Sequence, residues 1–128
     1  KSLLFPINEI SISKSKTSTL EEDLINVINK SIKNHKLSES AHEEIYSLQH
    51  SDPDVAKIFF EQEIQATNRL ISVLENKNIQ TENIKEKAHL IISMIDNLCH
   101  EVVYHKHKDM NYDIMKEIVV KSIINLLK

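Results

Sequence analysis

Residues 51–76, SDPDVAKIFFEQEIQATNRLISVLEN, decide the fold of this chain. Asp52 can cap the start of a helix, and Pro53 fits the first helical position because it has no N–H group that needs a partner. At 100° per residue, the apolar side chains from Val55 to Leu74 spread over an arc of roughly 240°, whereas an ordinary surface helix carries a stripe of a little over ~100°. The stretch therefore predicts a central buried helix with neighbours on several sides.

Two polar residues, Glu63 and Thr67, lie one turn apart inside this apolar arc. Burying an unpaired carboxylate is costly, so a partner is expected. Either a neighbouring side chain or backbone group satisfies the two residues, or Glu63 orients a ligand in an apolar pocket. Such a pocket would suit a small hydrophobic molecule, in particular a cationic or hydroxyl-bearing one. The predicted ligand-binding residues are Phe59, Phe60, Glu63, Ile64, Thr67, Met94 and Leu98.

The composition indicates one all-α domain. The chain has 128 residues, enough for a core, and it has no glycine and two prolines, so it lacks the turn residues of hairpins and the glycine-rich loops of nucleotide-binding folds. Its single cysteine, Cys99, favours a reducing compartment, and no apolar run or leader indicates membrane insertion or secretion, so we expect a cytoplasmic protein. A net charge of −3 and a single arginine give this stretch no face for DNA.

About five helices are predicted. Thr19-Leu20-Glu21-Glu22 is a capping box that starts a helix over about 19–35. Ser38 starts a shorter helix over about 38–50, ahead of the central one. Before the first helix, the sequence predicts the tail of another helix over 1–5 and a connector over 7–18, which are separated by Pro6.

The second half of the chain predicts a long helical pair. Asn76-Lys77-Asn78 can end the central helix because asparagine tolerates the left-handed conformation, and Thr81 can cap the next helix. That helix is predicted over about 82–107 and the last one over about 111–128. The last helix is apolar almost all the way round, so it needs two surfaces to cover it, and a second copy of the chain is the simplest source of one. Ile114, Ile118 and Ile124 point away from the seam predicted for a homodimer, which is formed by Met115, Val119, Ile123 and Leu126.

Several histidine and carboxylate patterns resemble metal sites. His89, Ser93, Asp96 and His100 form a row on the polar half of their helix, and a solvated or partner-facing row is the favoured interpretation over a metal site. His100 and His105 are five residues apart, which does not suit a zinc-binding helix that needs four.

Two Glu-x-x-His pairs, Glu39/His42 and Glu86/His89, with Glu63 between them, resemble the ligands of di-iron carboxylate bundles. Two such pairs are close to the number expected by chance, and Glu86 and His89 point away from the apolar half of their helix. No nucleophile signature or phosphate-binding loop is present, so we predict no enzyme, no cofactor and no metal.

The order of these helices resembles the C-terminal core of the tetracycline-repressor (TetR) family of transcriptional regulators. The stretches that carry the resemblance are DPDVAKIFFEQEIQATNRLISVLENKNIQ, then ENIKEKAHLIISMIDNLCHEVV, and the closing DIMKEIVVKSIINLLK. In that family the middle helices enclose a ligand pocket and the last two form a four-helix dimer interface.

The resemblance implies that residues 19–128 form a ligand-sensing and dimerisation domain and that residues 1–5 end the linking helix. It also implies that a helix-turn-helix domain outside this sequence binds operator DNA and releases it when an effector binds. A helical protein-interaction module without a ligand is the alternative, and a di-iron protein is the third hypothesis.

Overall fold

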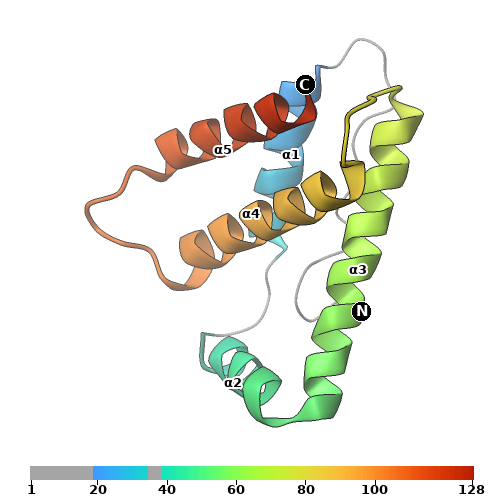
Figure 1. Ribbon diagram of the computed structural model, residues 1–128. Coiled ribbons are helices and arrows are strands. Elements are labelled where there is room, and N and C mark those ends of the chain that lie inside the picture. Colours follow the sequence, from blue (N-terminus) through green and yellow to red (C-terminus); the bar gives the residue numbers. More distant parts are fainter. Residues whose placement is uncertain (1–18, 35–38) are drawn as a thin grey trace.

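The computed structural model describes residues 19–34 and 39–128, and this part of the chain is all-helical (Figure 1). Its five helices are α1 (Leu20–Lys33), α2 (Glu39–Ser51), α3 (Pro53–Asn76), α4 (Ile84–Tyr104) and α5 (Tyr112–Leu127). The predicted all-α fold of about five helices is therefore confirmed. The predicted helix tail at 1–5, the connector at 7–18 and the helix start at Ser38 lie outside the described residues.

Most of the helix starts follow from their capping residues. The hydroxyl of Thr19 accepts a hydrogen bond from the backbone N–H of Glu22 at 3.1 Å, and the carboxylate of Asp52 accepts one from Asp54 at 2.9 Å. The prediction that Thr81 caps α4 is wrong. Asn83 precedes that helix in the left-handed region at φ 54°, because the chain makes a turn there, and the Thr81 hydroxyl accepts a hydrogen bond from the Lys87 ammonium instead, at 2.6 Å.

The end of α3 is a complete Schellman motif around Asn78, at the position where the sequence predicted an asparagine cap. Asn78 has a φ of 60°, its N–H donates to the carbonyl of Glu75 at 3.0 Å, and the N–H of Ile79 donates to the carbonyl of Leu74 at 3.0 Å. Leu74 is buried and Ile79 packs against the same core. The motif thus turns the chain away from α3 without leaving its last carbonyls unpaired.

Replacing Asn78 with glycine is expected to stabilise the fold by up to about 1 kcal/mol, because glycine has no Cβ to oppose a positive φ. The same change at Asn68, which is exposed in the middle of α3, should destabilise the protein by a few tenths of a kcal/mol, since glycine is a weaker helix former than asparagine. Urea unfolding of both variants would measure the two free energies. Equal signs for the two changes would contradict this account of the α3 terminus.

The main apolar core lies among α1, α4, α5 and the C-terminal half of α3. It is built from Leu24, Val27, Ile28, Ala66, Leu70, Leu74, Ala88, Ile91, Ile92, Ile95, Leu98, Cys99, Val120, Ile123 and Leu127. Of the helices in the described residues, α4 is the one that packs against α1, α3 and α5 together, so the central position belongs to α4. The predicted central helix, α3, packs against α2 and α4, and part of its wide apolar arc stays exposed.

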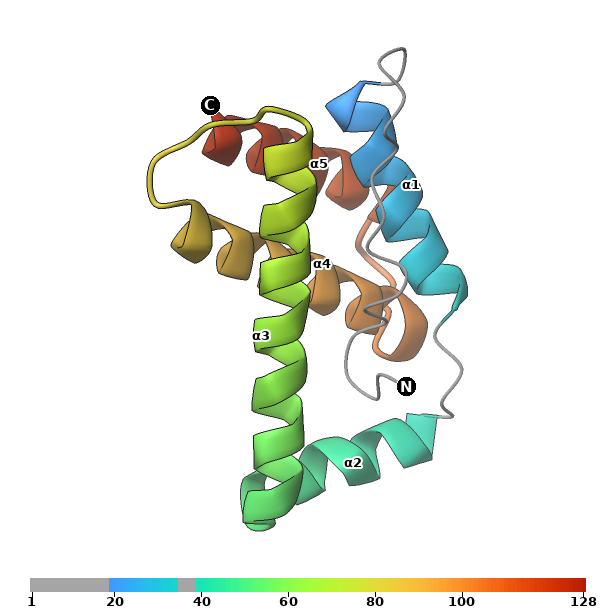
Figure 2. The ribbon, with the colours of Figure 1, turned by 90° about the vertical axis from the view of Figure 1, so that its right-hand side faces the viewer.

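The N-terminal half of α3 extends beyond the main core and meets α2 there, as both ribbon views show (Figure 2). Phe59 is the buried apolar side chain of this half, with 1% of its surface exposed. No residue of α2 belongs to the main core cluster. Contacts outside that cluster, with α3 and with aromatic and polar groups of α4, therefore join α2 to the rest of the described chain.

Candidate functional site

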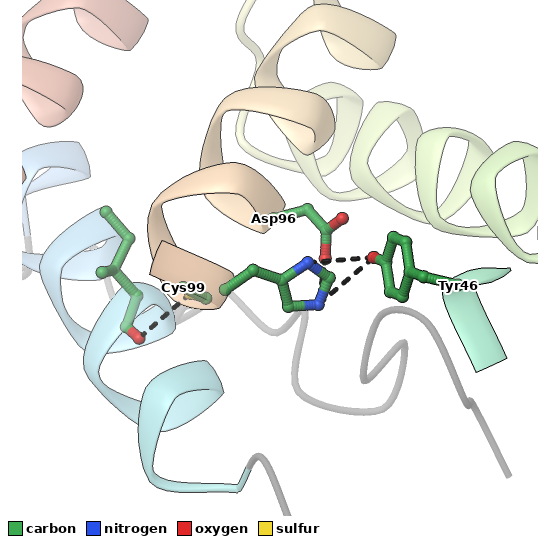
Figure 3. Close-up of polar contacts among 5 residues, drawn as sticks. Tyr46, Asp96 and Cys99 are labelled. Carbon is green, nitrogen blue, oxygen red and sulfur yellow. Dashed lines mark hydrogen bonds and ion pairs between the residues drawn. The ribbon is translucent and has the colours of Figure 1, made fainter. Parts of the chain in front are cut away.

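A polar cluster occupies the junction of α2, α3 and α4, and its centre is the hydroxyl of Tyr46. This hydroxyl lies 2.9 Å from Nδ1 of His100 and is hydrogen-bonded to the carboxyl group of Asp96. Nε2 of His100 lies 3.4 Å from Oδ1 of Asp96. Figure 3 shows the Asp96 side chain directed from α4 toward Tyr46 of α2. We call Tyr46, Asp96 and His100 the triad of this junction.

Aromatic rings surround the triad. The buried ring of His42 stacks on Tyr104 at 4.1 Å between centroids and meets the His100 ring edge-on at 4.7 Å. The ring of Phe59, from α3, packs edge-on against Tyr46 at 5.3 Å. Since α2 contributes His42 and Tyr46, these ring contacts and the hydrogen bonds of the triad connect α2 to α4.

The electrostatics of the cluster favour a proton on Asp96. Burial, and then the nearby carboxylate of Glu63, raise the pKa of Asp96 to about 8, against a smaller lowering by the hydrogen bond from Tyr46. Burial and the charge of Asp96 also raise the pKa of Tyr46 above its ordinary value, so this hydroxyl keeps its proton. The junction thus holds two carboxyl groups, Glu63 and Asp96, on facing helices with little water around the second one.

The spacing of the cluster residues along the helices explains how they converge. His42 and Tyr46 are four residues apart on α2, and Asp96, His100 and Tyr104 follow the same spacing on α4, so each set shares one helix face. This repeated spacing of four is the signal in the sequence that could have found the site. The spacing alone does not place these side chains inside the protein, because polar side chains on a helix face are more often exposed to solvent.

The predicted pocket residues separate into three groups. Phe59, Glu63 and Thr67 face the junction with α4 or lie near it, whereas Phe60 and Ile64 are 64% and 36% exposed. Leu98 belongs to the main core, and Met94 packs against that core. On α4, Met94 and Leu98 lie roughly 160° around the helix from Asp96. The structure therefore does not gather the predicted set around one cavity.

Thr67 is satisfied by the backbone, as one of the two interpretations from the sequence expected. Its hydroxyl donates to the carbonyl of Glu63 at 2.8 Å and lies 3.3 Å from Nδ1 of His89. The prediction of a solvated or partner-facing row from His89 to His100 holds for the exposed Ser93 and is wrong for Asp96 and His100. His100 is 9% exposed and the Asp96 side chain 19%, because this half of α4 is covered by α2 and α3.

His42 and His89, from the two pairs that resembled di-iron ligands, contact different residues. His42 contacts the rings of His100 and Tyr104, and His89 contacts Thr67. In residues 19–34 and 39–128, no three histidine, cysteine or carboxylate side chains come together in a way that could hold a metal ion.

A surface depression of about 440 Å³ lies elsewhere, at the loop between α4 and α5. It is lined by Lys106, Lys108, Asp109, Met110, Asn111, Tyr112 and Asp113. The loop is braced by Tyr112, whose hydroxyl accepts a hydrogen bond from the backbone N–H of His107 at 2.7 Å. None of the predicted ligand-binding residues lines this depression.

The structure divides the apolar residues of α5 between the inside and the outside of the protomer. Ile123 has no exposed surface, and the other members of the predicted seam, Met115, Val119 and Leu126, pack against the chain's own core. Ile114 and Ile118 are 51% and 57% exposed, on the opposite side of α5. The apolar α5 surface that remains for another protein is therefore the one formed by Ile114 and Ile118.

Comparisons of this chain with protein-family models, with curated proteins and with solved structures found no match. Among the described residues, no helix is both long enough and apolar enough to cross a membrane.

Proposed function

We propose that residues 19–128 form the effector-sensing and dimerisation domain of a TetR-like transcriptional repressor, which would act in the cytoplasm and release operator DNA when an effector binds. The observation that carries the proposal is the polar and aromatic cluster at the junction of α2, α3 and α4. A bundle that needed only stability would fill this position with apolar side chains, because buried polar groups contribute little net free energy even when paired.

The chemistry of the junction favours a cationic effector with an apolar body. Glu63 supplies negative charge, Asp96 would ionise beside a bound cation, and the faces of Tyr46, Phe59 and Tyr104 can attract a cation through their π electrons. A bound cation would lower the pKa of Asp96, so its arrival would release the proton that this carboxyl group holds. Binding would separate or rotate α2, α3 and α4, and a DNA-binding domain joined to this domain would respond to that shift.

The proposed partner in assembly is a second copy of the chain, bound through α4 and α5. Ile114, Ile118, Ser122 and Asn125 form an exposed stripe along α5, and none of these four residues is charged. The Glu117–Lys121 ion pair lies at the edge of this stripe. On α4, Leu90 is also 54% exposed. An uncharged stripe suits an isologous contact, since each residue near the two-fold axis meets its own copy without repulsion.

A thermal-shift screen tests the effector proposal. Aromatic quaternary ammonium compounds are expected to raise the melting temperature, by roughly 10 °C for a compound at 100 times its Kd, whereas neutral compounds of the same shape should not. Glu63→Gln should reduce the shift, and Glu61→Gln should not, because Glu61 lies roughly 160° around α3 from Glu63 and its side chain is 56% exposed. Equal shifts for cations and neutral compounds, or no shift with any compound, would contradict the proposed site.

A helical protein-interaction module is the second candidate, and the exposed residues of α3 favour it. Ile58 and Phe60 are 44% and 64% exposed on the half of α3 that extends beyond the main core. Aromatic side chains of this kind are frequent anchors in protein–protein contacts. A protein that showed no cation-dependent stabilisation, but lost a bound protein partner after Phe60→Ser, would support this function instead.

A further inference from the structure

We propose that the triad of Tyr46, Asp96 and His100 is a proton-dependent latch that fastens α2 to α4 and loosens as the pH rises from about 6.5 to 8. The proposal concerns a property of the domain itself and requires neither an effector nor DNA. It rests on the way α2 is attached. Its contacts with α4 include the ring packing of His42 and the hydrogen bond of Tyr46, it also packs against α3, and no α2 residue enters the main core cluster.

The hydrogen bonds of the latch depend on where one proton lies. With a proton on Asp96, the carboxylic O–H can donate to the Tyr46 oxygen, and the Tyr46 O–H can donate to Nδ1 of His100. Two hydrogen bonds then link the three side chains, and none of them carries a charge. When Asp96 loses its proton, its carboxylate accepts the hydrogen bond of the Tyr46 hydroxyl. That hydroxyl can then no longer donate to His100, so His100 has to donate an N–H to the Tyr46 oxygen.

The surroundings of Asp96 oppose the loss of this proton. Tyr46 faces it from α2, Glu63 acts on it from α3, and His100 lies one turn away on its own helix. Cys99 of α4 is directed to the other side, where its thiol lies 3.9 Å from the carbonyl of Ile28 in α1 (Figure 3). Lys116 of α5 partly offsets the rise in the pKa of Cys99 that burial causes. The causes that shift the pKa of Asp96 include no cation. The ionised state would thus place two carboxylates in one poorly solvated junction.

The direction of the pH effect follows from the two states of the latch. In the closed state the pKa of Asp96 is about 8, and in an open state exposed to water it would return toward 3.8. The closed state binds the proton more tightly, so raising the pH between these values favours opening, by up to tenfold per pH unit. Above about pH 8 both states are ionised and the effect levels off. The window from pH 6.5 to 8 lies between these two pKa values.

Hydrogen exchange of the whole chain, followed by mass spectrometry, tests the latch. The protection factor of α2 peptides, which corrects for the intrinsic effect of pH on exchange, is expected to fall by up to about 15-fold between pH 6.5 and 8, and to level off at higher pH. Peptides of α5 should keep their protection. Asp96→Asn, which resembles the protonated group, should remove the pH dependence, and Asp109→Asn in the exposed loop should retain it.

A second variant keeps the test valid if Asp96→Asn does not fold. Glu63→Gln removes the repulsion that raises the pKa of Asp96, so the loss of α2 protection should be smaller and should level off at a lower pH. A protection factor for α2 that stays constant from pH 6.5 to 8, or a dependence that Asp96→Asn or Glu63→Gln leaves unchanged, would overturn the proposal. These results do not depend on any ligand, so they separate the latch from the proposed sensing function.

Discussion

Ile118→Lys is expected to convert a homodimer into a monomer of 14.8 kDa without unfolding the protomer. Ile118 is 57% exposed, so the lysine can reach water in the monomer, whereas in a dimer it would place a charge within an apolar contact. At least a 100-fold increase in the dimer Kd is expected, equivalent to about 2.7 kcal/mol. Sedimentation velocity at tens of micromolar would measure it, with circular dichroism as the check on folding.

The matched control for this change is Ile58→Lys. Ile58 is 44% exposed, similar to Ile118, but it lies on α3 and not on the α4–α5 pair. This variant should remain dimeric. A wild-type protein that sediments as a monomer, or an Ile118→Lys protein that remains a dimer, would show that Ile114 and Ile118 do not form the contact between copies.

Lys77→Met is expected to destabilise the protomer by about 3 kcal/mol, because it leaves the buried carboxylate of Asp23 without its cation. The ammonium of Lys77, which follows the end of α3, lies 2.9 Å from Asp23 Oδ2 in α1, and the Asp23 side chain is only 1% exposed. For a domain of this size the melting temperature should fall by roughly 10 °C. Thermal and urea unfolding would measure the loss.

Removing the charge of the other partner, by Asp23→Asn, should reduce the stability less. The Lys77 side chain is 17% exposed, so its flexible stem can carry the unpaired ammonium into water. Adding Asp23→Asn to Lys77→Met should recover about half or more of the lost stability, since no charge then stays buried. Lys121→Met, which breaks the exposed pair with Glu117, should change stability by no more than about 1 kcal/mol. Additive effects of the two changes at Asp23 and Lys77 would rule out their coupling.

The sequence by itself determined the helices and most of their ends. Thr19, Asp52 and Asn78 act through hydrogen bonds or backbone angles within a few residues, and such local chemistry is visible in a sequence without any knowledge of the fold. The absence of glycine and the helical spacing of apolar residues likewise indicated an all-α domain. Thr81 was the exception, since the turn at Asn83 and the contact with Lys87 displaced it as a cap.

The tertiary structure alone decided which side of each helix is covered. The apolar arc of α3 was correctly recognised as wide, but only the crossing of α3 with α4 determines that Phe59 is buried while its neighbour Phe60 is 64% exposed. In the same way, the polar side of α4 became an interior surface because α2 and α3 lie over it, and Asp96 and His100 meet Tyr46 there. Tyr46 and His100 are 54 residues apart, and helical periodicity carries no information about contacts at that separation.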